Sequence, residues 1–216
     1  NIRDAKTKMF VIISDAMRYE VAKELSEDLV REMQCKVEMR NMEGIFPTIT
    51  PFGMAALLPK EEMELEAGNG TVTVLDDGEP TGANYREKVL RKANPASVVL
   101  KYEELIQLRR DERKAKVKGM EVIYIYHDRI DAAGHGSGHD VFTACDEAID
   151  EVKNLVRIIV NDFSGVNILI TSDHGFIYTY DAFTEADKVE KIDFSGTVDC
   201  GRRYAIMEES AQPQYL

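Results

Sequence analysis

Three stretches of the chain consist almost entirely of apolar residues and have the length of one buried strand. They cover residues 8–14, 122–126 and 166–170. Continuous apolar runs of this length are typical of strands that are covered on both faces of a sheet. Shorter runs at 35–39 and 71–75 resemble strands as well. The hydrophobic pattern therefore predicts strands at five places.

Apolar residues at helical spacing alternate with these strands. The spacing predicts helices over 17–32, 85–93 and 102–116, a long helix that starts at Asp140, and a short apolar helix over 52–58. Residues 76–83 contain adjacent acids, two glycines and a proline, so we expect an exposed loop there. Strands that alternate with helices favour right-handed crossovers. We therefore predict an α/β fold with a largely parallel sheet.

Length and composition are those of one globular domain. The 216 residues suffice for a single α/β core, and we expect one domain over 1–216. The chain opens without an initiator Met or a signal-peptide pattern, so we expect it to be a fragment of a longer protein. No apolar run approaches the roughly 20 residues that span a bilayer. Three widely spaced cysteines argue against a disulfide framework, and we expect a cytoplasmic location.

The net charge of −12 weakens one class of function. A protein that binds nucleic acid through its phosphates needs a basic face. The only dense basic stretch here lies between Arg109 and Lys118, and it is typical of the solvated end of a helix. The charge does not exclude a phosphate substrate, because divalent metal would offset clustered carboxylates.

Carboxylates or histidines follow each of the three buried strands. Asp15 follows the first strand, Asp131 and His135 follow the second, and Asp173 and His174 follow the third. Ligands of open α/β sheets bind at the carboxyl ends of the strands. Each residue alone can serve as a helix cap or a turn residue. Together, mixed Asp and His ligands suit zinc or manganese, whereas sets of oxygen ligands suit magnesium.

Two hydroxyls, of Thr48 and Thr50, lie in a segment bounded by Pro47 and Pro51. Threonine between prolines is more often a turn residue than a nucleophile. Coordination to a metal would activate such a hydroxyl without a neighbouring base. Two metals about 4 Å apart can also hold the attacking and leaving oxygens of a phosphoryl transfer. Both threonines are therefore candidate nucleophiles.

Four segments together resemble the PglZ family of the alkaline phosphatase superfamily, which is best known from BREX phage-defence systems. They are residues 14–20, 46–51, 126–135 and 171–176. The resemblance covers about residues 8 to 180. It implies an alkaline phosphatase-like core, with helices on both faces of a largely parallel sheet. Asp-His-Gly alone would be unspecific, but the four motifs in this order are specific.

The resemblance also implies roles for the candidate residues. Asp15, Asp173 and His174 would hold one zinc, and Asp131 and His135 would hold a second. A threonine would face the first zinc as the nucleophile. In phosphodiesterase relatives the nucleophile lies two residues after a Pro-Thr, which favours Thr50 over Thr48. Manganese or magnesium could replace zinc.

The sequence departs from the superfamily at the second metal. The superfamily has a further histidine well after the Asp-His-Gly, whereas none of His127, His135, His139 and His174 lies beyond position 174. Either that ligand lies outside these 216 residues, or His139 or His127 replaces it. A catalytic zinc normally has three protein ligands. We therefore expect this chain to bind its second metal weakly and to be much less active than its parent.

These observations predict a metal-dependent phosphoester hydrolase. Diesters, including nucleotides or a nucleic acid strand, fit better than monoesters, and other BREX proteins are the expected partners. The first alternative is a degenerate module that retains the fold and serves as an interaction platform in a defence complex. A weaker alternative is a metal-dependent isomerase or mutase of sugar phosphates, which uses the same ligands.

Overall fold

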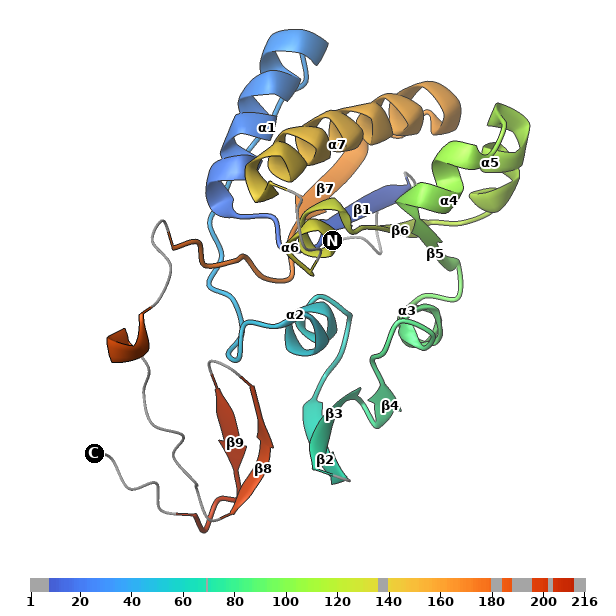
Figure 1. Ribbon diagram of the computed structural model, residues 1–216. Helices are drawn as coiled ribbons and strands as arrows, with labels where there is room; N and C mark the ends of the chain where they lie inside the picture. Colours follow the sequence, from blue (N-terminus) through green and yellow to red (C-terminus); the bar gives the residue numbers. More distant parts are fainter. Residues whose placement is uncertain are drawn as a thin grey trace.

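The core of the chain is a sheet of four parallel strands (Figure 1). The computed structural model describes residues 8–68, 70–135, 140–179, 184–187, 196–201 and 204–211. The strand order is β5-β6-β1-β7, and each neighbouring pair is parallel. The strands are β1 (Met9–Ser14), β5 (Ser97–Lys101), β6 (Val122–His127) and β7 (Asn167–Thr171). The predicted parallel sheet and the strands predicted at 8–14, 122–126 and 166–170 are therefore confirmed, but β7 is only partly buried, with Leu169 52% exposed, and is not covered on both faces as predicted.

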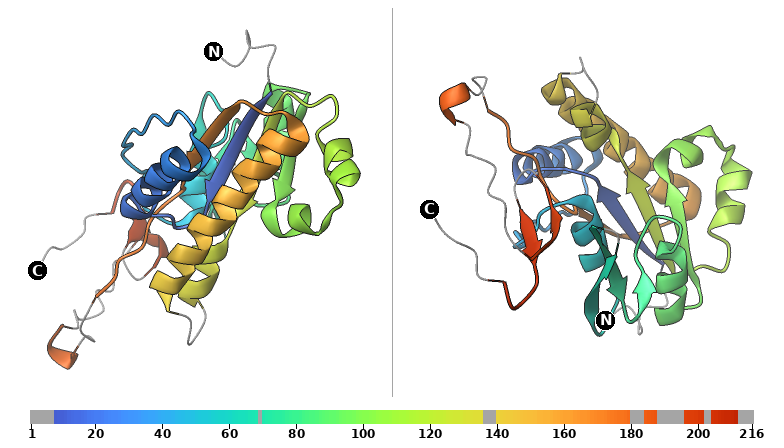
Figure 2. Two further views of the ribbon diagram at one scale, coloured as in Figure 1. Left: turned by 90° about the horizontal axis from the view of Figure 1, so that it is seen from above. Right: turned by 60° about the horizontal axis from the view of Figure 1, so that its bottom comes forward.

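Helices cover both faces of this sheet, as predicted. On one face, α1 (Tyr19–Met33) and α7 (Val141–Phe163) bury apolar side chains against Phe10, Ile12 and Ile123. On the other face, Met54 from α2 (Thr50–Ala56) packs on Val11 and Ile13. Figure 2 shows α1 and α7 lying side by side over the sheet. The remaining helices are α3 (Arg86–Ala93), α4 (Tyr102–Gln107), α5 (Arg110–Lys116) and α6 (Arg129–His135).

Two small antiparallel sheets lie beside the α2 face (Figure 1). The Val72 amide of the first sheet donates a 3.2 Å hydrogen bond to the Asp199 carboxylate of the second. The first sheet comprises β2 (Met63–Gly68), β3 (Thr71–Asp76) and β4 (Glu79–Pro80). The second comprises β8 (Thr197–Cys200) and β9 (Ala205–Met207). A 3-10 turn, η2, covers Glu185–Asp187. Within the described ranges, no helix combines the length and apolarity needed to cross a membrane.

Three local predictions were wrong. Residues 35–39 are not a strand, although their burial alternates, because none of the described strands pairs with this segment. The helix predicted over 102–116 is two helices, α4 and α5. Residues 76–83 are not an exposed loop, because they include the end of β3 and all of β4, and Asp76 is only 1% exposed.

Candidate metal centre

The candidate residues lie at the carboxyl edge of the parallel sheet. Strand β1 lies between β6 and β7, with Ser14 paired to His127 and Ile13 paired to Thr171. The residue that follows Ser14 is Asp15, and its amide donates a 2.8 Å hydrogen bond to the His127 carbonyl. Asp15 is therefore held at the centre of this edge, within reach of side chains from both neighbouring strands.

One cluster consists of Asp15, Asp173 and His174. One potential ligand atom from each residue lies within 4.8 Å of the others. Nε2 of His174 lies 3.4 Å from Oδ1 of Asp15 and 3.5 Å from Oδ2 of Asp173. The structure thus brings together the three residues that the sequence singled out for a first metal.

The two carboxylates of this cluster are buried, but not all of their oxygens accept a hydrogen bond from the described residues. Asp15 is 7% exposed and Asp173 is 6% exposed. Oδ1 of Asp15 and Oδ2 of Asp173 have no hydrogen-bond partner among the described residues, whereas Oδ1 of Asp173 accepts a 3.3 Å bond from the Ala16 amide. Ala16 itself has a φ of 61°, in the left-handed region that is uncommon for alanine. A buried polar atom without a partner is costly unless another group satisfies it.

The unpartnered oxygens fit a divalent metal. Zinc bonds to nitrogen and carboxylate oxygen are about 2.1 Å long, so two ligands of a tetrahedral ion lie roughly 3.4 Å apart. The distances of 3.4 Å and 3.5 Å from His174 to the two carboxylates match that separation. They are too long for good hydrogen bonds. Two aspartates and one histidine are therefore a suitable set for zinc or manganese.

Burial raises the pKa values of both carboxyls. Burial is the main cause for Asp15, and the charges of Asp173, Asp131 and Asp128 add to it, raising the pKa of Asp15 to about 8. Burial likewise raises the pKa of Asp173, although the nearby His174 opposes the shift. A cation between these groups would favour their charged forms.

Thr50 contacts this cluster and Thr48 does not. Oγ1 of Thr50 lies 2.9 Å from Nε2 of His174, and the residue is half-buried at the first position of α2. Thr48 is exposed in the preceding loop. Pro51 lies in the first turn of α2, where its missing N–H costs nothing. The helix starts at Thr50, two residues earlier than predicted.

A glycine allows α2 to approach the loop after β7 closely. A Cβ atom at Gly53 would lie 2.3 Å from the carbonyl oxygen of Asp173, far inside the van der Waals limit. Any larger side chain would therefore separate Thr50 from His174. This glycine was not among the site residues predicted from the sequence.

A second cluster consists of Asp15, Asp128 and Asp131, with carboxylate oxygens within 4.8 Å of one another. Residues 129–135 form the helix α6, so Asp131 and His135 lie one turn apart on the same side. Nε2 of His135 is 3.2 Å from Oδ2 of Asp131, but His135 is largely exposed and is outside the cluster. Asp128 was not among the predicted site residues, although it follows β6 directly.

His127 is engaged elsewhere and does not replace the missing histidine ligand. Its Nδ1 lies 2.9 Å from Oγ of Ser14, and its Nε2 lies 2.7 Å from the Glu151 carboxylate. The ring is 1% exposed and packs edge-on against Tyr102. Arg129 also pairs with Glu151, and despite partial burial these bonds lower the pKa of Glu151 to about 2. The other candidate, His139, lies outside the described residues.

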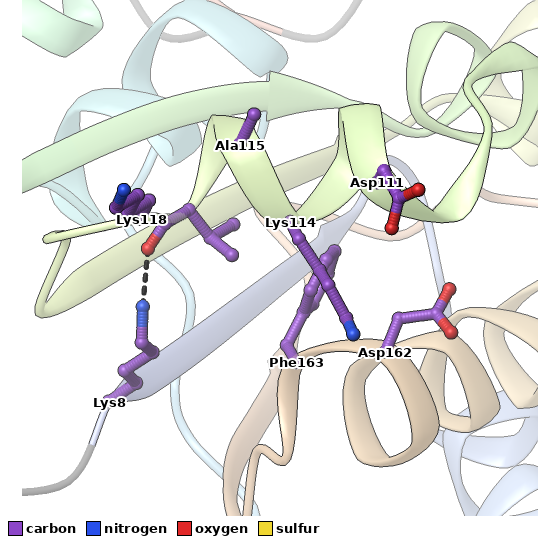
Figure 3. A pocket seen from close by; sticks show the side chains of 8 residues that line it. Lys8, Asp111, Lys114, Ala115, Lys118, Asp162 and Phe163 are labelled. Atoms are coloured by element: carbon purple, nitrogen blue, oxygen red, sulfur yellow. Dashed lines mark hydrogen bonds between the residues drawn. The ribbon is translucent and has the colours of Figure 1, made fainter.

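The basic stretch belongs to a different part of the molecule. It borders a hollow of about 390 Å³ beside Lys8, at the opposite, amino-terminal edge of the sheet (Figure 3). Arg110 and Arg113 of α5 pair with Asp162 at 3.1 Å and 3.2 Å. The stretch is a solvated surface, as predicted, and does not face the candidate metal centre.

The parallel sheet and its helices define an α/β protein of the alkaline phosphatase-like class. A family model described as the BREX system PglZ alkaline phosphatase-like domain matches residues 1–216, and the chain belongs to this family. It is 39% identical over 205 residues to the alkaline phosphatase-like protein PglZ of Bacillus cereus (strain H3081.97), which covers 94% of this chain and 24% of that protein. It is 35% identical over 202 residues to the alkaline phosphatase-like protein BrxZ of Escherichia coli O9:H4 (strain HS), covering 92% of this chain and 23% of that protein. The chain spans about a quarter of the length of these relatives.

Proposed function

We propose that this chain is the catalytic domain of a metal-dependent phosphoester hydrolase that acts in phage defence alongside other BREX proteins. The observation that carries the proposal is the 2.9 Å contact between Oγ1 of Thr50 and Nε2 of His174, beside two buried carboxylates with unpartnered oxygens. A hydroxyl and a set of metal ligands thus meet at one place. The relatives are named as alkaline phosphatase-like proteins, which supports the same class of reaction.

The proposed first metal is zinc, held by Asp15, Asp173 and His174. Bound there, it would lower the pKa of a coordinated hydroxyl and polarise a phosphoryl oxygen. We also assign Asp131 and His135 to a second metal, as the resemblance implies. The raised pKa of Asp15 and that of Asp173 are consistent with a centre built to hold a cation.

Thr50 is the proposed nucleophile. Its Oγ1 forms a bond to phosphorus while the bond from phosphorus to the leaving oxygen breaks; the hydroxyl proton of Thr50 passes to solvent and the leaving oxygen takes up a proton from solvent. A water oxygen then attacks the same phosphorus, the Oγ1–P bond breaks, and one of the two water protons restores the Thr50 hydroxyl while the phosphate product is released. The start of α2 and the close packing at Gly53 orient Thr50 toward the ester throughout.

Two aromatic side chains favour a nucleotide-like diester as the substrate. Phe142 and Tyr178 are about half exposed, and their ring centroids lie 4.7 Å apart. Tyr178 is only four residues after His174 in the chain. Exposed aromatic rings can provide stacking surfaces for a base.

The test compares Thr50→Ala with the matched control Thr48→Ala in the full-length protein. Turnover of a p-nitrophenyl monoester, the bis-p-nitrophenyl diester and DNA is measured with and without zinc, together with zinc content. We expect Thr50→Ala to lose turnover about 1,000-fold or more with unchanged zinc content, and Thr48→Ala to retain it. Equal losses in both variants would refute the assignment of Thr50.

The same experiment tests the alternative of a non-catalytic module. Wild-type protein that holds zinc at Asp173 and His174 but turns over none of the three substrates would support an interaction platform. Asp173→Ala should abolish zinc binding whether the protein is a hydrolase or a non-catalytic interaction platform.

A further inference from the structure

We infer that Arg86, the first residue of α3, binds the non-bridging oxygens of the phosphoester beside Thr50, and that the ring of Tyr126 holds its guanidinium in place. The inference rests on the proposed function and adds the side chains that recognise the charge of the substrate. Neither Arg86 nor Tyr126 was among the site residues predicted from the sequence.

Arg86 is a half-buried arginine without a carboxylate partner. Its guanidinium carbon lies 4.6 Å from the centroid of the Tyr126 ring, and its Nε donates a 3.3 Å hydrogen bond to the Thr81 carbonyl. No carboxylate in the described part of the chain forms an ion pair with Arg86, whereas Arg91 of the same helix pairs with Glu87. A partly buried charge without a counter-charge is unfavourable unless a ligand supplies one. In a chain with a net charge of −12, an arginine left unpaired in this way points to an anionic ligand.

The strand register brings Tyr126 to the edge of the sheet where the metal ligands lie. Tyr126 in β6 is paired with Ile13 in β1, and Ile13 is paired in turn with Thr171 in β7. Asp15 and Asp173 each follow two residues after these partners. Tyr126 therefore lies at the same carboxyl edge as the candidate metal centre.

The side chain of Tyr126 lies on the face of the sheet that carries Thr50. It packs with Met54 of α2, the helix that begins at Thr50. Successive side chains of a strand point to opposite faces, and the next residue, His127, accordingly packs against Tyr102 on the other face. The stacked pair of Arg86 and Tyr126 is thus on the nucleophile's side of the sheet.

Charge interactions at the Tyr126 hydroxyl support this placement. Burial raises the pKa of Tyr126, the charge of Arg86 opposes the shift, and the charge of Asp173 adds to it. Such interactions weaken with distance, so the guanidinium and the metal-binding carboxylate both lie near this one hydroxyl. Arg86 is therefore the cation that flanks the acidic centre on the α2 face.

The chemistry of the guanidinium determines the class of ligand. Its planar fork matches two oxygens of a phosphoryl group through parallel N–H···O bonds, and an aromatic ring beneath it fixes the plane of the fork. Monoesters and diesters both have two non-bridging oxygens. Carboxylates at the centre repel a phosphate, and a fixed positive charge beside them offsets part of this repulsion.

The test measures binding of inorganic phosphate to the zinc-loaded, full-length protein by calorimetry, together with KM for bis-p-nitrophenyl phosphate. We expect Arg86→Gln to weaken phosphate binding by about tenfold or more, with zinc content unchanged, because it removes a charged hydrogen-bond donor. The matched control is Lys88→Gln, which removes the same charge from an exposed position on the same helix and should stay within about twofold of the wild type.

Two further variants separate a role in binding from a role in folding. Arg86→Lys keeps the charge but not the fork, and serves if Arg86→Gln does not fold; we expect it to weaken phosphate binding by about threefold or more. Tyr126→Leu should weaken phosphate binding by a similar factor of about three, and Tyr126→Phe, which keeps the ring, should restore it.

The remaining outcomes overturn the inference in distinguishable ways. Wild-type phosphate affinity in both Arg86 variants would exclude Arg86 as a ligand while leaving Thr50 and the zinc cluster of the proposed function intact. Loss of zinc in Arg86→Gln would show that Arg86 supports the metal centre and does not bind the ester. An equal loss of phosphate affinity in Lys88→Gln would assign the effect to net charge. A wild-type protein that binds neither zinc nor phosphate would remove the proposed function together with the inference.

Discussion

Asp15→Asn should make the metal-free protein more stable and, at the same time, abolish its stabilisation by zinc. The substitution keeps the size of the side chain and removes one of the buried charges. In the native protein burial, followed by repulsion from Asp173, raises the pKa of Asp15 to about 8, whereas in the unfolded chain a carboxyl titrates near 4. The stability linked to the protonated carboxyl is therefore fully present below about pH 4 and is lost as the pH rises through about 8.

The structure sets the size of this effect. A pH of 7 is about three units above the pKa of Asp15 in the unfolded chain, and each unit corresponds to about 1.4 kcal/mol. The deprotonated Asp15 can therefore lower the free energy of unfolding by at most about 4 kcal/mol at pH 7. Water that reaches the open side of the centre lowers this value, and we expect about 2 kcal/mol. For a chain of this size that is a rise in Tm of about 4–8 °C.

The measurement is urea and thermal unfolding of chelator-treated protein at pH 4 and pH 7, repeated after zinc is added. Without metal, Asp15→Asn should exceed the wild type in stability at pH 7 and equal it near pH 4. Zinc at 100 times its Kd should stabilise the wild type by about 2.7 kcal/mol and the variant hardly at all, so that the order of stabilities reverses. The exposed Asp146→Asn should follow the wild type throughout. A metal-free Asp15→Asn that is less stable than the wild type at pH 7, or an equal gain from zinc in both, would refute the reasoning.

Two further predictions concern α2 and the small sheet. Gly53→Ala should reduce turnover at least tenfold and destabilise the fold by about 1–3 kcal/mol, because its Cβ would overlap the Asp173 carbonyl. Gly68→Ala at the end of β2, where no atom lies within 4 Å, is the control in kinetic and urea assays. Asp76 is 1% exposed with both oxygens unpartnered, and burial raises its pKa even though Lys60 opposes the shift. As the pH rises from about 4 to 7, the wild type should therefore lose about 1 kcal/mol of unfolding free energy relative to Asp76→Asn. Urea unfolding that gives the two proteins the same dependence on pH would contradict this.

The central strands could be predicted because burial on both faces leaves a continuous apolar run. The short strand β5 was missed, because Ser97 to Lys101 follows a proline and offers only three apolar residues. The segment 35–39 shows the opposite error. Its alternating side chains do pack, with Cys35 and Val37 against the main core, but a strand also needs a hydrogen-bonding neighbour, which local sequence cannot reveal.

The break between α4 and α5 depends on tertiary contacts as well. Arg113 donates hydrogen bonds to the carbonyls of Leu105 and Ile106, so a side chain of the second helix satisfies the end of the first. No proline or glycine marks this break, and helical spacing continues across it. The amphipathic pattern therefore predicted one helix where the structure has two.

The first cluster could be anticipated because parallel neighbours deliver the residues after their ends to the same edge. Asp128 was not predicted as a site residue, because the motif after β6 was interpreted from Asp131 and His135, which lie three and seven positions later in the chain. The strand register was needed to show that Asp128 lies beside Asp15. The contact of Gly53 with the Asp173 carbonyl could not be inferred either, since it depends on how closely α2 approaches the loop after β7.

The central position of β1 has a consequence for the order in which the chain folds. The hydrogen bond from the Ala16 amide to the Asp173 carboxylate spans 157 positions. Contacts of such long sequence separation form late, after the intervening segments have collapsed. During synthesis, domains fold only as their segments emerge. The zinc ligands can therefore assemble only after β7 has docked beside β1, so a nascent chain that stops before Asp173 would display isolated carboxylates and compete poorly for metal.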